Sequence, residues 1–231
     1  MAHHRAHVVL AVAVLAGRVG PAIGRGVSMT TALVVMAKAP IPGLAKTRLI
    51  PAFGAEGAAH LAHRLLQHSV HQALALHADY LELCVSPDTR HSAFDLAFAN
   101  ANGKLTLTVQ EEGDLGHRMH CVFERVLREH AKVLLMGTDA PALTTDVVRR
   151  AEQALTDHEA VFVPAMDGGY ALVGLTRPVP SLFYAMTWST QHVMAHTRLR
   201  AQQARLTYKE LAPVHDIDEP ADLIHQPGGW Q

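Results

Sequence analysis

The sequence predicts an α/β protein whose sheet is mainly parallel and carries helices on both faces. From about Thr30, short apolar runs alternate with longer segments of helical periodicity, the order that βαβ units produce. The run "KVLLMG" is apolar without alternation, as in a central strand covered on both sides. Three of the segments that follow such runs concentrate Gly, Pro and charge, and ligands of parallel sheets bind beyond the carboxyl ends of the strands.

The individual elements follow from the period of the apolar residues. The expected strands span residues 32–37, 80–86, 105–109, 132–137 and 160–164, with later strands in "YALVGL" and "RLTYKEL". The expected helices span residues 55–77, 91–99, 116–130, 144–157 and 191–203. Gly54 and Gly57 mark the start of the first helix. We expect Asp218 to cap a short final helix that has Pro220 in its first turn.

Composition excludes several classes of protein. Lys and Arg number 20 against 21 Asp and Glu, so the chain lacks the basic excess of a nonspecific nucleic-acid binder. Two cysteines cannot form a disulfide scaffold, and none of the 17 histidines joins a set with zinc spacing. Cys84 lies in the apolar run "LELCV", and a buried thiol fits a reducing, cytoplasmic location.

The amino terminus differs from the rest of the chain. Its apolar run "HVVLAVAVLAG" is shorter than the roughly 20 residues that cross a membrane, so no membrane span is expected. We expect residues 1–28 to be a poorly ordered extension, with a cleaved signal peptide as the alternative. Residues 30–225 then form one domain, and residues 226–231 form a tail.

The stretch "MAKAPIPGLAKTRL" after the first strand has features that suit a phosphate. Gly43 allows close approach of the backbone, and Lys46 and Arg48 flank Thr47, so they could clamp an anion. The stretch is not a Walker A loop, because it lacks the glycine directly before the lysine. Taken alone, it could equally be a solvated basic loop.

The stretch "LLMGTDAPAL" places Asp139 just after the most apolar strand. A carboxylate there could hold Mg²⁺, which takes one or two protein carboxylates and completes its shell with phosphate and water. Alternatively, Asp139 orders the turn before Pro141. Asp216, Asp218 and Asp222 form a second acidic group, one member of which could complete the metal site if the fold returns it to Asp139.

In the stretch "PAMDGGYALVGL", Asp167 precedes Gly168 and Gly169. The glycines allow a sharp turn that leaves room for a bulky ligand. An ordinary Asp-Gly hairpin turn explains the same residues.

Six motifs together resemble one bacterial family. "MAKAPIPGLAKTRL", "QEEGDLGHRM", "LLMGTDAPAL", "PAMDGGYALVGL", "TWST" and "DIDEPADL" occur in an order similar to that of GT-A-type glycosyltransferase-like proteins, over residues 31–224. Those proteins are related to molybdenum-cofactor and phospholactate guanylyltransferases, and some are described as arsenosugar-biosynthesis glycosyltransferases. The resemblance implies a single GT-A, nucleotide-diphospho-sugar transferase domain of Rossmann-like α/β fold.

The resemblance also implies roles for particular residues. Asp139 and Asp218 would hold Mg²⁺ or Mn²⁺, and the catalytic residues would be Asp139, Asp167, Lys46 and Arg48. Nucleotide and phosphate contacts would come from Ala37, Lys38, Gly43, Lys46, Thr47, Arg48, Gly113, Asp114 and Arg118. Contacts to the sugar or the acceptor would come from Asp167, Gly168, Gly169, Tyr170 and Trp188.

Two departures from the family pattern stand out. The usual Asp-x-Asp is absent because Thr138 and Ala140 flank Asp139, and His117 stands where relatives often carry an acidic residue. The expected activity is metal-dependent glycosyl transfer from a nucleotide sugar to a small-molecule acceptor, by a chain that could form a homodimer. The alternatives are nucleotidyl transfer from an NTP to a phosphorylated small molecule, with release of pyrophosphate, and a nucleotide-binding domain without catalysis.

Overall fold

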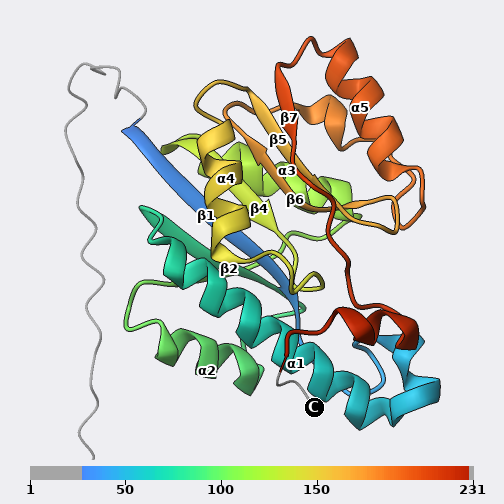
Figure 1. Cartoon of the computed structure of the whole chain (residues 1–231). Coiled ribbons are helices and arrows are strands. Elements are labelled where there is room, and N and C mark those ends of the chain that lie inside the picture. Colours follow the sequence, from blue (N-terminus) through green and yellow to red (C-terminus); the bar gives the residue numbers. More distant parts are fainter. Residues whose placement is uncertain (1–27, 229–231) are drawn as a thin grey trace, which may run out of the picture.

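A computed structural model describes residues 28–228 as one α/β domain (Figure 1). The strands are β1 (Ser28–Lys38), β2 (Tyr80–Ser86), β3 (Thr106–Val109), β4 (His130–Met136), β5 (Ala160–Pro164), β6 (Tyr170–Leu175) and β7 (Tyr208–Glu210). The α-helices are α1 (Ile50–Leu76), α2 (Ser92–Asn100), α3 (Leu115–Val126), α4 (Thr145–Ala154) and α5 (Val193–Gln203). Short 3-10 helices are η1 (Thr47–Leu49), η2 (Pro180–Leu182) and η3 (Pro220–His225).

All seven strands form one sheet in the order β3-β2-β1-β4-β6-β5-β7. Only β6 runs against its neighbours, because it pairs antiparallel with both β4 and β5. A short loop suffices between β5 and β6, whereas parallel neighbours need a longer crossover. The prediction of a mainly parallel sheet is confirmed.

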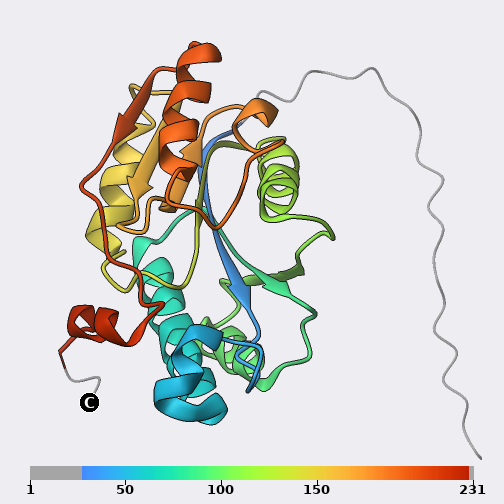
Figure 2. The ribbon, with the colours of Figure 1, turned by 90° about the vertical axis from the view of Figure 1, so that its right-hand side faces the viewer.

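Helices cover both faces of this sheet, as predicted, and Figure 2 shows it lying between α4 and α3. One core cluster holds Leu66 of α1, Phe94 of α2 and Val148 of α4. The other holds Phe123 of α3 and Met194 of α5. Alternate residues of β1 contribute to the two clusters, which explains why that strand is apolar throughout.

Most predicted elements lie within a few residues of the observed ones, and the largest difference is at α1. This helix begins at Ile50, with a proline in its first turn, where the absent N–H is harmless. Gly54, with φ of 69°, interrupts the helix instead of starting it.

A charged group lies buried inside the sheet, which the sequence pattern did not reveal. Glu82 of β2 is fully buried, and its carboxylate accepts hydrogen bonds from Arg125 at 2.9 and 2.6 Å, from Thr108 at 2.6 Å and from Tyr80 at 2.8 Å. Burial raises the pKa of Glu82, but these hydrogen bonds lower it by more, so the pKa lies below its usual value. The neighbouring Cys84 is buried as expected, and burial raises the pKa of its thiol to about 11.

The predicted amino-terminal extension lies outside the described residues, except for Ser28, which begins β1. Within residues 28–228, no helix is both long and apolar enough to cross a membrane.

Candidate active site

The basic stretch forms a tight loop between β1 and α1. Gly43 has φ of 79° and Lys46 has φ of 47°, so the chain turns twice through the left-handed region before η1 begins. The ammonium of Lys38 donates to the carbonyl of Leu44 at 2.9 Å. The Lys38 side chain therefore stabilises the loop, and the left-handed conformation of Gly43 allows the chain to turn there.

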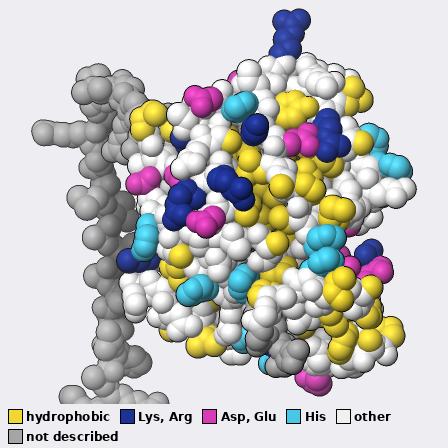
Figure 3. Space-filling model, in the orientation of Figure 1, with side chains coloured by type: hydrophobic (Ala, Val, Ile, Leu, Met, Phe, Trp, Pro, Cys, Tyr) yellow, Lys and Arg dark blue, Asp and Glu magenta, His cyan; other side chains and the backbone are white. Residues whose placement is uncertain are grey.

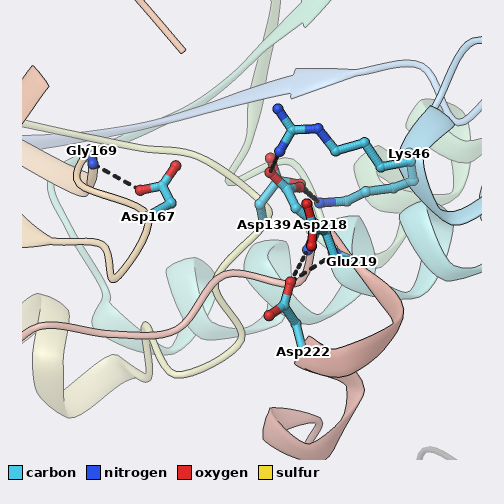
Figure 4. Close-up of polar contacts among 8 residues, drawn as sticks. Lys46, Asp139, Asp167, Gly169, Asp218, Glu219 and Asp222 are labelled. Carbon is cyan, nitrogen blue, oxygen red and sulfur yellow. Dashed lines mark hydrogen bonds and ion pairs between the residues drawn. The ribbon is translucent and has the colours of Figure 1, made fainter. Parts of the chain in front are cut away.

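The loop directs Lys46 between two aspartates (Figure 4). Its Nζ lies 2.6 Å from Asp139 Oδ1 and 2.8 Å from Asp218 Oδ1, and its side chain is only 7% exposed. Burial lowers the pKa of Lys46, but the two carboxylates raise it by more, so the ammonium stays charged. Arg48 lies farther out, with Nη1 3.9 Å from Asp218 Oδ2.

Asp218 reaches this point because the carboxyl-terminal segment returns across the sheet, as Figures 1 and 2 show. The backbone N–H of Ile217 donates to the carbonyl of Asp139 at 2.9 Å, which places the segment beside the end of β4. The prediction that Asp218 caps the last helix is wrong: Glu219 is the N-cap residue of η3. The carboxylate of Asp222 accepts from the N–H groups of Asp218 and Glu219, so the Asp218 side chain can face Lys46.

A cavity of about 590 Å³ opens at this end of the sheet. Most of the predicted site residues line it: Ala37, Lys38, Lys46, Thr47, Arg48, Arg118, Asp139, Asp167, Gly169, Tyr170, Trp188 and Asp218. The residues predicted for the phosphates, the metal and the sugar thus share one cavity.

Four of the predicted site residues do not line the cavity: Gly43, Gly113, Asp114 and Gly168. Gly43 belongs to the loop described above. Gly113 has φ of 117°, and its carbonyl accepts from Arg118 Nε at 2.9 Å, while Asp114 caps α3 by accepting from the N–H of His117 at 2.8 Å. Gly168 lies against the backbone of Gln191, where an added Cβ would come within 2.2 Å of a carbonyl oxygen.

Gln110 was not predicted as a site residue, although it lies in a quoted motif. Its side-chain amide donates to the carbonyl groups of Ala37 and Cys84, each at 3.0 Å, and so joins β1 to β2 beside the cavity, which Gln110 also lines. Its Oε1 lies 3.4 Å from Nη1 of Arg118. Because these partners lie 73, 26 and 8 positions away, sequence spacing alone could not reveal the role.

Asp216 also lines the cavity, whereas the sequence pointed only to its acidic group as a whole. Burial is the main cause that raises the pKa of Asp216, to about 6, and the carboxylates of Asp167, Asp218 and Asp139 add to the effect. The carboxylates of this cavity therefore repel one another, and a bound cation would relieve that repulsion.

The Asp-Gly-Gly stretch forms the loop between β5 and β6, for which the sequence allowed either an ordinary hairpin turn or a turn that leaves room for a ligand. Asp167 Oδ1 accepts from the N–H of Gly169 at 2.8 Å, and the N–H of Gly168 donates to the carbonyl of Ala165, so the segment is a hairpin turn. Asp167 also lines the cavity, and Figure 4 shows it apart from the cluster around Lys46.

The two carboxylates beside Lys46 fit a divalent cation in their chemistry. Both present an oxygen to one point, which the ammonium of Lys46 now occupies, and carboxylate oxygen suits Mg²⁺ and Mn²⁺. Within residues 28–228, no three or more His, Cys, Asp and Glu side chains are grouped to hold a metal, and the histidines on the face in Figure 3 lie scattered. Further ligands would have to come from a substrate or from water.

The fold is of the nucleotide-diphospho-sugar transferase class, as comparison with a solved structure shows. A structure of a candidate nucleotide-diphospho-sugar transferase from Desulfovibrio desulfuricans G20 is 29% identical, covers 84% of each chain and has a TM-score of 0.76. Residues 69–190 match the family described as "Uncharacterized protein conserved in bacteria (DUF2064)", and the chain belongs to that family.

More distant structures share the fold alone. A nucleotidyl transferase from Methanothermobacter thermautotrophicus is 12% identical, with a TM-score of 0.55 over 84% of this chain and 94% of that one. The Rv0371c protein of Mycobacterium tuberculosis H37Rv, in complex with manganese, is 19% identical, with a TM-score of 0.52 over 85% and 96%. No curated protein matches this sequence.

Proposed function

We propose that this protein is a metal-dependent glycosyltransferase that uses a nucleotide-diphospho-sugar donor and a small-molecule acceptor. The observation that carries the proposal is the convergence of Asp139 and Asp218 on one buried cation position at the carboxyl end of the sheet. The likeness to the Desulfovibrio structure supports the choice of donor.

The residues around that position would act on the diphosphate. Asp139 and Asp218 would hold Mg²⁺ or Mn²⁺, which supplies positive charge to the departing nucleoside diphosphate when bound. Lys46 would leave the carboxylates and turn its ammonium toward the phosphates. Arg48, which is more exposed, would complete the clamp from the cavity mouth.

The opposite wall would serve the sugar and the acceptor. Asp167 lines this wall apart from the Lys46 cluster; its Oδ1 accepts from Gly169, and its second carboxylate oxygen would orient an acceptor hydroxyl or accept its proton. Tyr170 and Trp188 form an aromatic surface there, with ring centroids 6.3 Å apart and planes at 88°. Arg118, held by Gln110 and Gly113, would contact the nucleotide.

Nucleotidyl transfer is the second candidate, and one observation favours it. Glycosyltransferases of this type usually carry an Asp-x-Asp at one strand end. Here the two carboxylates, Asp139 and Asp218, come instead from segments 79 positions apart. The same cations could then act on the α-phosphate of an NTP while a phosphorylated acceptor attacks it.

Thermal-shift measurements with NTPs and nucleotide sugars, each with and without Mn²⁺, would test the proposal. We expect Mn²⁺-dependent stabilisation by a nucleotide sugar, lost in Asp139→Ala. Stabilisation by one NTP alone, followed by pyrophosphate release in the presence of a phosphorylated acceptor, would establish the second candidate instead. Binding without turnover of any acceptor would favour a non-catalytic nucleotide-binding domain.

A further inference from the structure

The loop that carries Trp188 is held firmly at both ends. Arg200 of α5 donates to the carbonyl groups of Ser181 at 3.2 Å, of Tyr184 at 2.6 Å and of Ala185 at 2.8 Å. At the other end, the N–H of Met194 donates to the carbonyl of Gly168 at 2.7 Å. We call residues 185–193, between these anchors, the Trp188 loop.

Two features inside the Trp188 loop are unfavourable. Ala185 has φ of 52° and Ser189 has φ of 59°, a left-handed conformation that residues other than glycine rarely adopt. The indole Nε1 of Trp188 is buried, and no residue in the range 28–228 accepts its hydrogen. A buried donor without an acceptor loses its hydration and receives nothing in return. Each of these features costs free energy in the free protein.

The surroundings of the indole explain why its N–H lacks an acceptor. A Cβ on Gly116 would lie 2.7 Å from Trp188 Nε1 and would also meet the backbone carbonyl of Phe183, so the first turn of α3 covers this nitrogen, and that carbonyl does not accept its hydrogen. The ring also contacts Tyr170, whose hydroxyl donates to the thioether of Met119 at 3.9 Å. Sulfur is a weak acceptor. Within residues 28–228, the buried indole N–H thus has no acceptor, and the neighbouring Tyr170 hydroxyl has only a weak one.

We propose that the N–H of Trp188 is the hydrogen-bond donor that recognises a hydroxyl oxygen of the transferred sugar, and that the free protein withholds it by burying it against Gly116. This inference rests on the proposed function. A sugar ring suits the wall because its C–H faces pack on aromatic rings while its oxygens accept hydrogen bonds. Ligand binding would shift the Trp188 loop between its two anchors, releasing the strain at Ser189 as the N–H gains its acceptor.

The test compares a nucleoside diphosphate with its own sugar conjugate, for example GDP with GDP-mannose and UDP with UDP-glucose, each with Mn²⁺. The background is Trp230→Phe, which leaves Trp188 as the sole tryptophan and serves as the control. In this background Trp188→Phe keeps an aromatic ring and removes the N–H. We expect it to weaken the sugar conjugate about tenfold, the effect of one hydrogen bond, and to leave the diphosphate within about twofold.

Two further readouts separate ligand recognition from simple packing. Because the variant removes an unsatisfied buried donor, the melting temperature of the free protein should not fall. The fluorescence of Trp188 should change with the sugar conjugate and not with the diphosphate. Equal weakening of both ligands, no weakening, or a lowered melting temperature would overturn this inference and leave the proposed function standing. If no nucleotide binds wild-type protein, the proposed function fails, and this inference fails with it.

Discussion

Lys46 Nζ and Asp218 Oδ1 lie 2.8 Å apart, although 172 positions separate the two residues in the chain. The contact joins the loop after the first strand to the carboxyl-terminal segment. With Asp139 as the third member, it gathers one buried cation and two partly exposed carboxylates at the end of the sheet. In the free protein the Lys46 ammonium pairs with both carboxylates. On ligand binding, the proposed function has the ammonium contact a phosphate and the carboxylates hold a metal ion.

Lys46→Met should weaken nucleotide binding by about 10- to 100-fold, since it removes a charge-assisted contact to phosphate. Binding of Mn²⁺ alone should persist or strengthen, because the ammonium no longer competes for the two carboxylates. Isothermal titration with GDP and with Mn²⁺ measures both effects. Lys132→Met, which changes a half-buried lysine of β4 whose ammonium donates to Thr156, is the control. Unchanged nucleotide affinity in Lys46→Met would place the phosphates elsewhere.

Asp139→Asn and Asp218→Asn should each abolish the thermal stabilisation that Mn²⁺ and nucleotide produce together. A ligand at 100 times its Kd contributes about 2.7 kcal/mol, which corresponds to roughly 5–10 °C for a domain of this size. Asp146→Asn changes an aspartate that pairs only on the surface of α4 and should retain the full shift. A complete Mn²⁺-dependent shift in either site variant would argue against that residue as a metal ligand.

Arg125→Ala should lower the free energy of unfolding by about 2–4 kcal/mol, because Glu82 would stay buried without its cation. Urea unfolding followed by circular dichroism measures this difference. Arg128→Ala, three residues farther along, breaks only an exposed pair with Glu124 and should change stability by less than about 0.5 kcal/mol. Similar losses in the two variants would show that burial of Glu82 does not set the effect.

The loss in Arg125→Ala should also depend on pH. The pKa of Glu82 lies below its usual value in the folded protein, so its stabilisation is present above the unfolded pKa and is lost as the pH falls through the folded pKa. The difference from wild type should therefore be largest near about pH 7 and shrink below about pH 4, where protonation removes the unpaired charge. A difference that grows on acidification would contradict this.

Gly168→Ala should destabilise the protein by about 2 kcal/mol or more. Gly168 has φ of 93°, and the new methyl group would meet the backbone of Gln191, which cannot move aside as a flexible side chain could. Differential scanning calorimetry measures the loss. Gly228→Ala, which has open space around it, is the control and should be nearly neutral.

The predictions for single elements succeeded where local pattern governs the structure. The run "KVLLMG" is buried on both faces, so its composition was sufficient to identify β4 as a central strand. The beginning of α1 was missed because Gly54 interrupts a helix that Ile50 and Pro51 had already started. Gly113 and Asp114 support the start of α3, and their contact with a nucleotide stays a prediction, because sequence alone does not distinguish a glycine that shapes a loop from one that admits a ligand.

By itself, the sequence determined the βαβ order, the mainly parallel sheet and the loops that carry Lys46, Asp139 and Asp167, because periodicity and turn chemistry are local properties of the chain. Only the tertiary structure decided which carboxylate of the final acidic group meets Lys46, how Gln110 joins two strands beneath Arg118, and that α3 covers the N–H of Trp188. Those relationships join segments far apart in the sequence, and the packing of the sheet and its helices, not spacing along the chain, sets their distances.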